Sequence, residues 1–112
     1  MTTIAPTKPV LLTFPTADVE SCLLAELIEV ATAEAQVRGI ELPKDPALMV
    51  KMSIRMDSLS VVDTLCAVEP AMGFELKDSL VRTGGYASVQ AALEHLMPKL
   101  EKAWMQKHGV KS

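Results

Sequence analysis

The sequence has few aromatic residues and few cysteines. Its 112 residues include one Trp, one Tyr, two Phe and two Cys, although 49% of them are apolar. Aromatic side chains favour strands, so a core made mainly from Ala, Leu, Val and Met predicts helices packed on helices. The length fits a single domain and is too short for a large enclosed catalytic pocket.

The chain also has no long apolar run, no basic run and no metal-binding motif. A membrane span needs about 20 apolar residues, so none is expected. The net charge is -3 and the bases are scattered, which argues against a nucleic-acid partner. Cys22 and Cys66 form neither a Cys-x-x-Cys pair nor a zinc pattern with His95 and His108. We therefore expect two reduced thiols, no metal site and a cytoplasmic protein.

Proline and glycine divide the chain into three parts. Three prolines interrupt residues 1–15, which lack the apolar core of a signal peptide and are expected to form an extended arm. Residues 16–106 are expected to form one helical domain, and residues 107–112 a flexible tail. Monomer is the expected oligomeric state.

Apolar periodicity predicts the helices of this domain. A first helix over about 17–38, with Thr16 as its N-cap, has a long apolar stripe and ends at Gly39. A long connection follows, with one possible helical turn near 47–52. Three further helices are expected: one from Asp57 or Ser58 to Gly73, a short one over 77–82, and a last one from Ser88 to about 105, in which Pro98 either makes a kink or opens a new helix. The apolar stripes consist of Val19, Leu23, Leu27, Val30 and Val37 in the first helix, and of Val61, Leu65, Val68 and Met72 in the second.

The tripeptide Asp57-Ser58-Leu59 opens the second of these helices. It is weak evidence alone, because Asp78-Ser79-Leu80 repeats it. A modified serine at a helix start has a physical reason, since free N–H groups and the helix dipole stabilise an added phosphodiester anion. A long helix follows Ser58, whereas only a few residues separate Ser79 from Gly84. This context favours Ser58.

The second helix has two apolar faces. At about 100° per residue, its core stripe occupies one narrow sector, and Leu59, Val62 and Cys66 occupy another. Asp63 and Glu69 lie on the flanks of this second patch. An apolar patch edged with acids suits a basic partner protein. The simpler interpretation is a helix buried on two sides, with solvated acids at its edges.

Residues 48–97, and more loosely the first helix, resemble the acyl carrier protein family, which includes peptidyl and aminoacyl carriers. The string Met56-Asp57-Ser58-Leu59-Ser60-Val61-Val62-Asp63 is similar to the family's modification motif and the start of its recognition helix. The similarity continues without gaps at Glu69, Met72, Leu76 and Asp78, and Ser88-Val89 is similar to the signal that opens the family's last helix.

The resemblance implies a four-helix acyl-carrier-like bundle with a long loop between helices 1 and 2, a short helix 3 and an extended C-terminal helix. It implies a 4'-phosphopantetheine arm, transferred from coenzyme A to Ser58 by a phosphopantetheinyl transferase. Asp57 would orient metal and phosphate in the transferase complex. A docking face for partner enzymes would consist of Leu59, Val62, Asp63, Cys66 and Glu69. The chain itself would be non-catalytic and would hold acyl groups as thioesters for a loading ligase and an acyltransferase or synthase.

Several departures from the family pattern favour a specialised carrier, for a dedicated lipid or polyketide pathway, over a general fatty-acid carrier. Arg55 replaces a usual glycine, Pro70 replaces a frequent acid, and Gly84-Gly85 adds about two residues before the last helix. An aminoacyl or peptidyl carrier of a nonribosomal-peptide-like system remains an alternative. A third possibility is a helical adaptor that has the carrier fold without modification, which Arg55 and the less acidic surface of the second helix support.

Three other side chains have simpler interpretations. Trp104 is expected to anchor the C-terminal end by packing, and His95 to lie at the surface or its boundary. Tyr86 is expected to close the bundle near the short helix, although it could instead contact the arm or its cargo.

Overall fold

The computed structural model describes residues 13–108, which form four α-helices and one short 3₁₀ helix, with no strand among them. The all-α fold class predicted from composition is therefore confirmed. The elements are α1 (Thr16–Arg38), α2 (Pro46–Lys51), α3 (Ser58–Met72), η2 (Asp78–Leu80) and α4 (Val89–Lys107).

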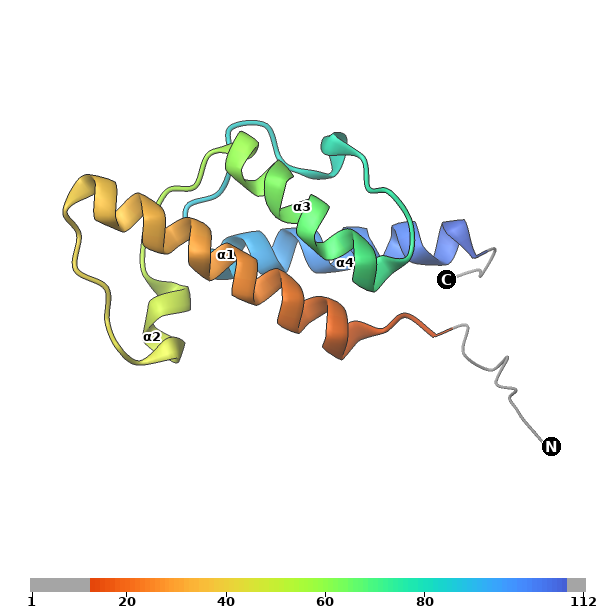
Figure 1. The fold of residues 1–112 in the computed structure, drawn as a ribbon, viewed down its shortest axis with the longest axis horizontal. Coiled ribbons are helices and arrows are strands. Elements are labelled where there is room, and N and C mark those ends of the chain that lie inside the picture. Colours follow the sequence, from red (N-terminus) through yellow and green to blue (C-terminus); the bar gives the residue numbers. More distant parts are fainter. Residues whose placement is uncertain (1–12, 109–112) are drawn as a thin grey trace.

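The three long helices form the body of the fold. Helix α1 packs against both α3 and α4, and α2 and η2 each pack against α4. Figure 1 shows α2 at the end of the molecule where α1 finishes. Within residues 13–108, no helix combines the length and the apolar character that crossing a membrane requires.

Three predicted helix ends agree with the structure, whereas the predicted first cap does not, and the short helix expected over 77–82 is limited to Asp78–Leu80. Helices α1 and α3 end at Gly39 and Gly73, and Ser88 caps α4 by accepting a 3.0 Å hydrogen bond from the Ala91 N–H. Thr16 is not the N-cap of α1. Pro15 occupies that position without a side-chain cap, and Thr16 is the first helical residue.

The long connection contains a real helix. Asp45 caps α2 by accepting a hydrogen bond from the Ala47 N–H at 2.9 Å, and Pro46 stands at the first helical position, where its missing N–H costs nothing. The buried residue of α2 is Met49.

The buried stripe of α1 differs from the predicted one in its second half. Val19, Leu23 and Leu27 are fully buried as predicted, but the stripe continues through Ala31 and Ala35. Val30 is only partly buried and Val37 is 84% exposed. The buried residues of α1 are four apart, so each step turns the buried side by about 40° around the helix. Val37 is only two residues from Ala35, which places the two side chains about 160° apart. In α3, by contrast, the whole predicted stripe is buried: Val61, Leu65, Val68 and Met72.

Proline lies inside both α3 and α4 without ending either helix. Pro70 is in the last turn of α3, and Pro98 is near the middle of α4. Helix α4 is therefore one helix rather than two. Each proline lacks an N–H, so the carbonyls of Cys66 and Glu94, four residues earlier, have no helical donor.

Trp104 anchors the last turn of α4, as predicted. Its ring is 5% exposed, packs edge-on against Phe14 at 6.1 Å and stacks on His108 at 4.1 Å. The core thus includes Phe14, before the expected domain start at residue 16, and α4 continues through Lys107. The rest of the expected arm and tail, residues 1–12 and 109–112, lies outside the described residues.

Replacement of Trp104 by alanine is expected to lower the free energy of unfolding by about 3–5 kcal/mol, because it empties a large buried site. Urea denaturation followed by circular dichroism measures this loss. Val37→Ala is the matched control, since that side chain is 84% exposed, and its effect should stay within about 0.5 kcal/mol. Equal effects of the two substitutions would contradict the packing role of Trp104.

Candidate functional site

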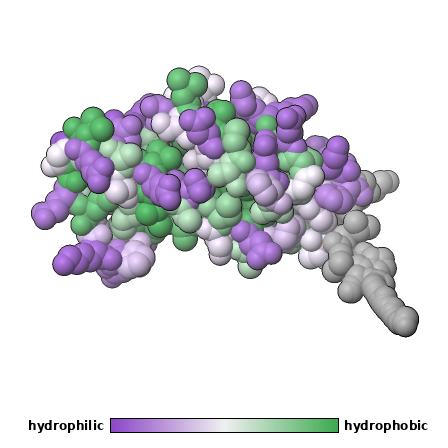
Figure 2. Space-filling model, viewed as in Figure 1, coloured by the Kyte–Doolittle hydropathy of each residue, from purple (hydrophilic) through white to green (hydrophobic). Residues whose placement is uncertain are grey.

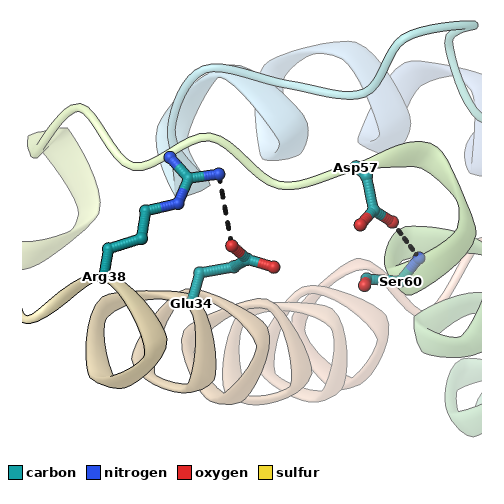
Figure 3. Close-up of polar contacts among 4 residues, drawn as sticks. All are labelled: Glu34, Arg38, Asp57 and Ser60. Carbon is teal, nitrogen blue, oxygen red and sulfur yellow. Dashed lines mark hydrogen bonds and ion pairs between the residues drawn. The ribbon is translucent and has the colours of Figure 1, made fainter.

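The start of α3 places the predicted serine at the first helical position. Asp57 is the N-cap, and its Oδ1 accepts a hydrogen bond from the Ser60 N–H at 2.8 Å (Figure 3). Ser58 follows directly and is partly exposed. The sequence left the helix start open between Asp57 and Ser58, and the structure assigns the cap to Asp57.

The cap interaction also fixes the charge of Asp57. The pKa of its carboxyl lies below the ordinary value of 3.8, chiefly because the Ser60 N–H hydrogen bond stabilises the carboxylate. Desolvation opposes this effect, and the nearby Ser60 side chain and Leu59 N–H support it. Asp57 is therefore an anion at neutral pH, directly before the Ser58 hydroxyl.

Asp57→Ala is expected to lower the free energy of unfolding by about 1 kcal/mol at neutral pH, because it removes the cap. The folded pKa of Asp57 is depressed, so its contribution is fully present above pH 3.8 and is lost as pH falls through the lower folded value. Asp57→Asn keeps a capping oxygen and should retain most of the neutral-pH stability while losing this acid dependence. Urea denaturation at neutral and acidic pH measures both effects, and an unchanged stability of Asp57→Ala would rule out the cap.

A loop far along the chain lies against the residues before Ser58. Met56 and Tyr86 form an isolated antiparallel bridge, with two N–H···O hydrogen bonds of 2.9 Å. The Arg55 guanidinium donates to the Gly84 carbonyl. Gly85 lies so close that an added Cβ would be 2.0 Å from the Met56 carbonyl oxygen. The 82–86 loop is therefore packed tightly against the backbone that leads into α3.

Tyr86 closes the bundle at this point, as one of the two interpretations predicted. Its side chain is 1% exposed, so it offers no surface to an arm or its cargo. The hydroxyl accepts a hydrogen bond from the Arg82 N–H at 2.9 Å and is 2.7 Å from His95 Nδ1. The Arg82 guanidinium lies over the same ring, 4.9 Å from its centroid.

The predicted docking face of α3 is largely open to solvent. Leu59 is 78% exposed, Asp63 and Cys66 are exposed, and Val62 is partly buried against the core. Figure 2 shows one face of the molecule, on which hydrophobic surface is broken into small patches between hydrophilic side chains. The opposite side of α3 is buried against the bundle. The helix is thus buried on one side rather than on two.

Glu69 has a structural partner that the sequence did not reveal. Its Oε2 accepts a hydrogen bond from the Leu76 N–H at 2.8 Å, and the residue is partly buried. The carboxylate therefore closes the turn after α3. Within the predicted docking face, Glu69 is thus the residue whose side chain accepts a hydrogen bond from another part of the fold.

The acidic surface continues from α3 onto α1. A shallow groove of about 290 Å³ between the two helices is lined by Ser60 and Asp63 of α3 and by acids of α1. One of these, Glu34, is paired with Arg38 at 3.2 Å (Figure 3). The sequence pattern of α3 did not indicate this extension, because α1 lies beside α3 only in the folded bundle. The groove is lined by Glu26, Glu29, Val30, Ala33, Glu34, Ser60, Asp63 and Thr64.

The second Asp-Ser-Leu copy has a different setting. Asp78, Ser79 and Leu80 make up the whole of η2, and Lys77 precedes them without a side-chain cap bond. Ser79 is exposed, but no extended helix follows it. Of the two Asp-Ser-Leu serines, Ser58 is the one that lies in the first turn of a long helix.

The described residues hold no cluster of three potential metal ligands. Cys22 and Cys66 are both free thiols. Asp57 is a single carboxylate, so it could contribute to a metal site only together with ligands from a partner. Neither a family model, nor a curated protein, nor a solved structure matches this chain.

Proposed function

We propose that the chain is a carrier protein that holds acyl intermediates as thioesters on a 4'-phosphopantetheine arm attached to Ser58. Its partners are a phosphopantetheinyl transferase, a ligase that loads the arm, and an acyltransferase or synthase of a specialised lipid or polyketide pathway. In this proposal α1, α3, η2 and α4 correspond to the four helices of the acyl-carrier-like bundle, and α2 lies in its long first loop.

The placement of Ser58 is the observation that best supports this proposal. The residue is partly exposed at the first position of a helix of 15 residues, beside the ionised cap Asp57. The free N–H groups of a helix start favour a covalently bound phosphodiester. The exposed Leu59 next to it gives a partner enzyme an apolar contact.

The chemistry requires a partner enzyme rather than a catalytic group of this chain. A P–O bond forms to Ser58 Oγ as the pyrophosphate bond of coenzyme A breaks, and the 3'-phosphorylated nucleotide leaves with the other phosphate. The hydroxyl proton passes to a base of the transferase. The two described histidines are bonded elsewhere, His95 to the Tyr86 hydroxyl and His108 to the Trp104 carbonyl. The arm's thiol then takes the acyl group.

Two alternatives remain, and they differ in what they require of Ser58. An aminoacyl or peptidyl carrier uses the same arm and differs only in the loading enzyme. An unmodified helical adaptor needs no arm, and Arg55 was one of its two supports in the sequence, beside the less acidic surface of the second helix. The hydrogen bond from Arg55 to the Gly84 carbonyl gives this residue a role in the fold, which weakens that support.

Intact mass spectrometry tests the proposal. The purified chain, incubated with coenzyme A, Mg²⁺ and a transferase of broad specificity, should gain one phosphopantetheine per chain. No gain with several such transferases would refute the carrier proposal and favour the adaptor. Loading reactions with fatty acids and with amino acids then separate the two kinds of carrier.

A further inference from the structure

We propose that the hydrogen bond between Tyr86 and His95 positions the start of α3 in a pH-dependent manner. Neutral His95 keeps the 82–86 loop against residues 55–57, and protonation of His95 loosens the loop. The consequence for Ser58 modification rests on the function proposed above, whereas the structural switch itself does not.

The hydrogen bonds around Tyr86 favour a neutral His95. The Tyr86 oxygen already accepts a hydrogen bond from the Arg82 N–H at 2.9 Å. Its own proton is therefore free to be donated to His95 Nδ1, 2.7 Å away. This donation requires an Nδ1 without a proton, which is the neutral imidazole with its proton on Nε2.

Protonation of His95 places two donors face to face. The Nδ1–H would then point at the Tyr86 hydroxyl, whose proton would need another acceptor. Tyr86 is 1% exposed, so water cannot readily supply one. A buried hydroxyl without an acceptor is costly, and the arrangement is expected to relax by moving the tyrosine.

The charges around His95 act in the same direction. Burial lowers the pKa of His95 below its ordinary value of 6.5, and Arg82 of the loop and Lys99 of α4 lower it further. Among the described residues, no charged side chain of α1, α2 or η2 contributes to this shift. The neighbouring acid Glu94 accepts a hydrogen bond from the Gln90 side chain at 3.1 Å.

The backbone of Tyr86 connects this hydrogen bond to the candidate site. Its N–H and carbonyl pair with Met56, two residues before Ser58. The adjacent Gly85 is in close contact with the Met56 carbonyl and with Asp57 Cα. A displacement of the tyrosine ring therefore acts on the residues that lead into α3.

Amide hydrogen exchange measured by NMR tests the switch without reference to function. Exchange is measured at about pH 7.5 and about pH 5, on either side of ordinary histidine titration, and is corrected for intrinsic rates. Protection of the Met56 and Tyr86 amides should fall about three- to tenfold at the lower pH, as expected for one lost hydrogen bond. Imidazole signals of His95 and His108 report which ring titrates over the same interval.

Three variants separate the switch from a general pH effect. His95→Asn keeps an acceptor near the Nδ1 position but does not titrate, so it should keep neutral-pH protection and lose the pH step. Tyr86→Phe should have low protection at both pH values. His108→Gln changes the other described histidine and should keep the step. A step that persists in His95→Asn, or a titration of His95 without loss of protection, would overturn the proposal.

The same variants address Ser58 through the rate of mass gain. For each protein, the rate of modification at the higher pH is divided by the rate at the lower pH. This ratio should differ between wild type and His95→Asn. Equal ratios would show that the loop does not affect modification. If no variant is modified at all, the carrier proposal fails, whereas the exchange measurements still decide the switch.

Discussion

Replacement of Ser58 by alanine is expected to abolish the gain of phosphopantetheine completely, because the substitution removes the only atom to which the arm would be attached. The fold should be almost unaffected. Alanine is a good helix former, and the cap of α3 is made by the Asp57 carboxylate and the Ser60 N–H rather than by Ser58. Intact mass and thermal denaturation of the same sample measure the two effects.

Ser79→Ala is the matched control, because this serine lies in the second Asp-Ser-Leu copy. It should be modified at the wild-type rate, since Ser79 lies in a 3₁₀ helix of only three residues. If Ser79→Ala loses the modification and Ser58→Ala keeps it, the arm is attached to the other copy. If both variants are modified, the arm is attached at neither serine.

Replacement of Gly85 by alanine is expected to destabilise the fold by at least about 3 kcal/mol. Its φ of +84° is unfavourable for any residue with a side chain. The added Cβ would also be 2.0 Å from the Met56 carbonyl oxygen and 2.9 Å from Asp57 Cα. Both are backbone atoms at the entry to α3, so no side-chain rotation can relieve the contact. Urea denaturation measures the loss of stability.

Gly84→Ala distinguishes backbone strain from this contact. Gly84 has a similar φ of +92°, but the nearest atom to an added Cβ is the end of the Arg55 side chain at 3.7 Å. Its substitution should cost about 1–2 kcal/mol, the penalty for left-handed backbone alone. Equal losses for the two alanine variants would show that the 82–86 loop is not packed tightly against the start of α3.

The sequence was informative where structure depends on neighbours along the chain. Ser88 and Gly73 mark helix ends because capping requires only local contacts. The stripe from Val61 to Met72 was predicted in full because a buried helix face repeats with the helical period. Val37 was wrongly predicted to be buried, because extending the seven-residue repeat takes no account of the rotation of the buried face around α1. Ala35 is buried instead, and an alanine is a weaker sign of burial in a sequence than a valine.

The contacts that surround the candidate site were not predictable in this way. Arg55 and Gly84 are 29 residues apart, and Tyr86 and His95 belong to different elements. Arg55 was interpreted from the sequence as a departure near the modification motif, whereas its guanidinium holds the 82–86 loop. From the sequence, Gly84 and Gly85 were interpreted only as additional residues before the last helix. The role of this glycine pair depends on the contact between the 82–86 loop and residues 55–57. Local sequence patterns cannot indicate such a contact.

Tyr86 and Trp104 are the only tyrosine and the only tryptophan of the chain, and they lie near opposite ends of α4. The distance along the helix from Val89, just after Tyr86, to Trp104 is about 22 Å at 1.5 Å per residue. Each end of the bundle thus contains its own spectroscopic reporter without any labelling. Coincident tyrosine and tryptophan transitions would indicate that the whole bundle melts as one cooperative unit. An earlier tyrosine transition would show that the Ser58 end opens first, while the Trp104 end is still folded.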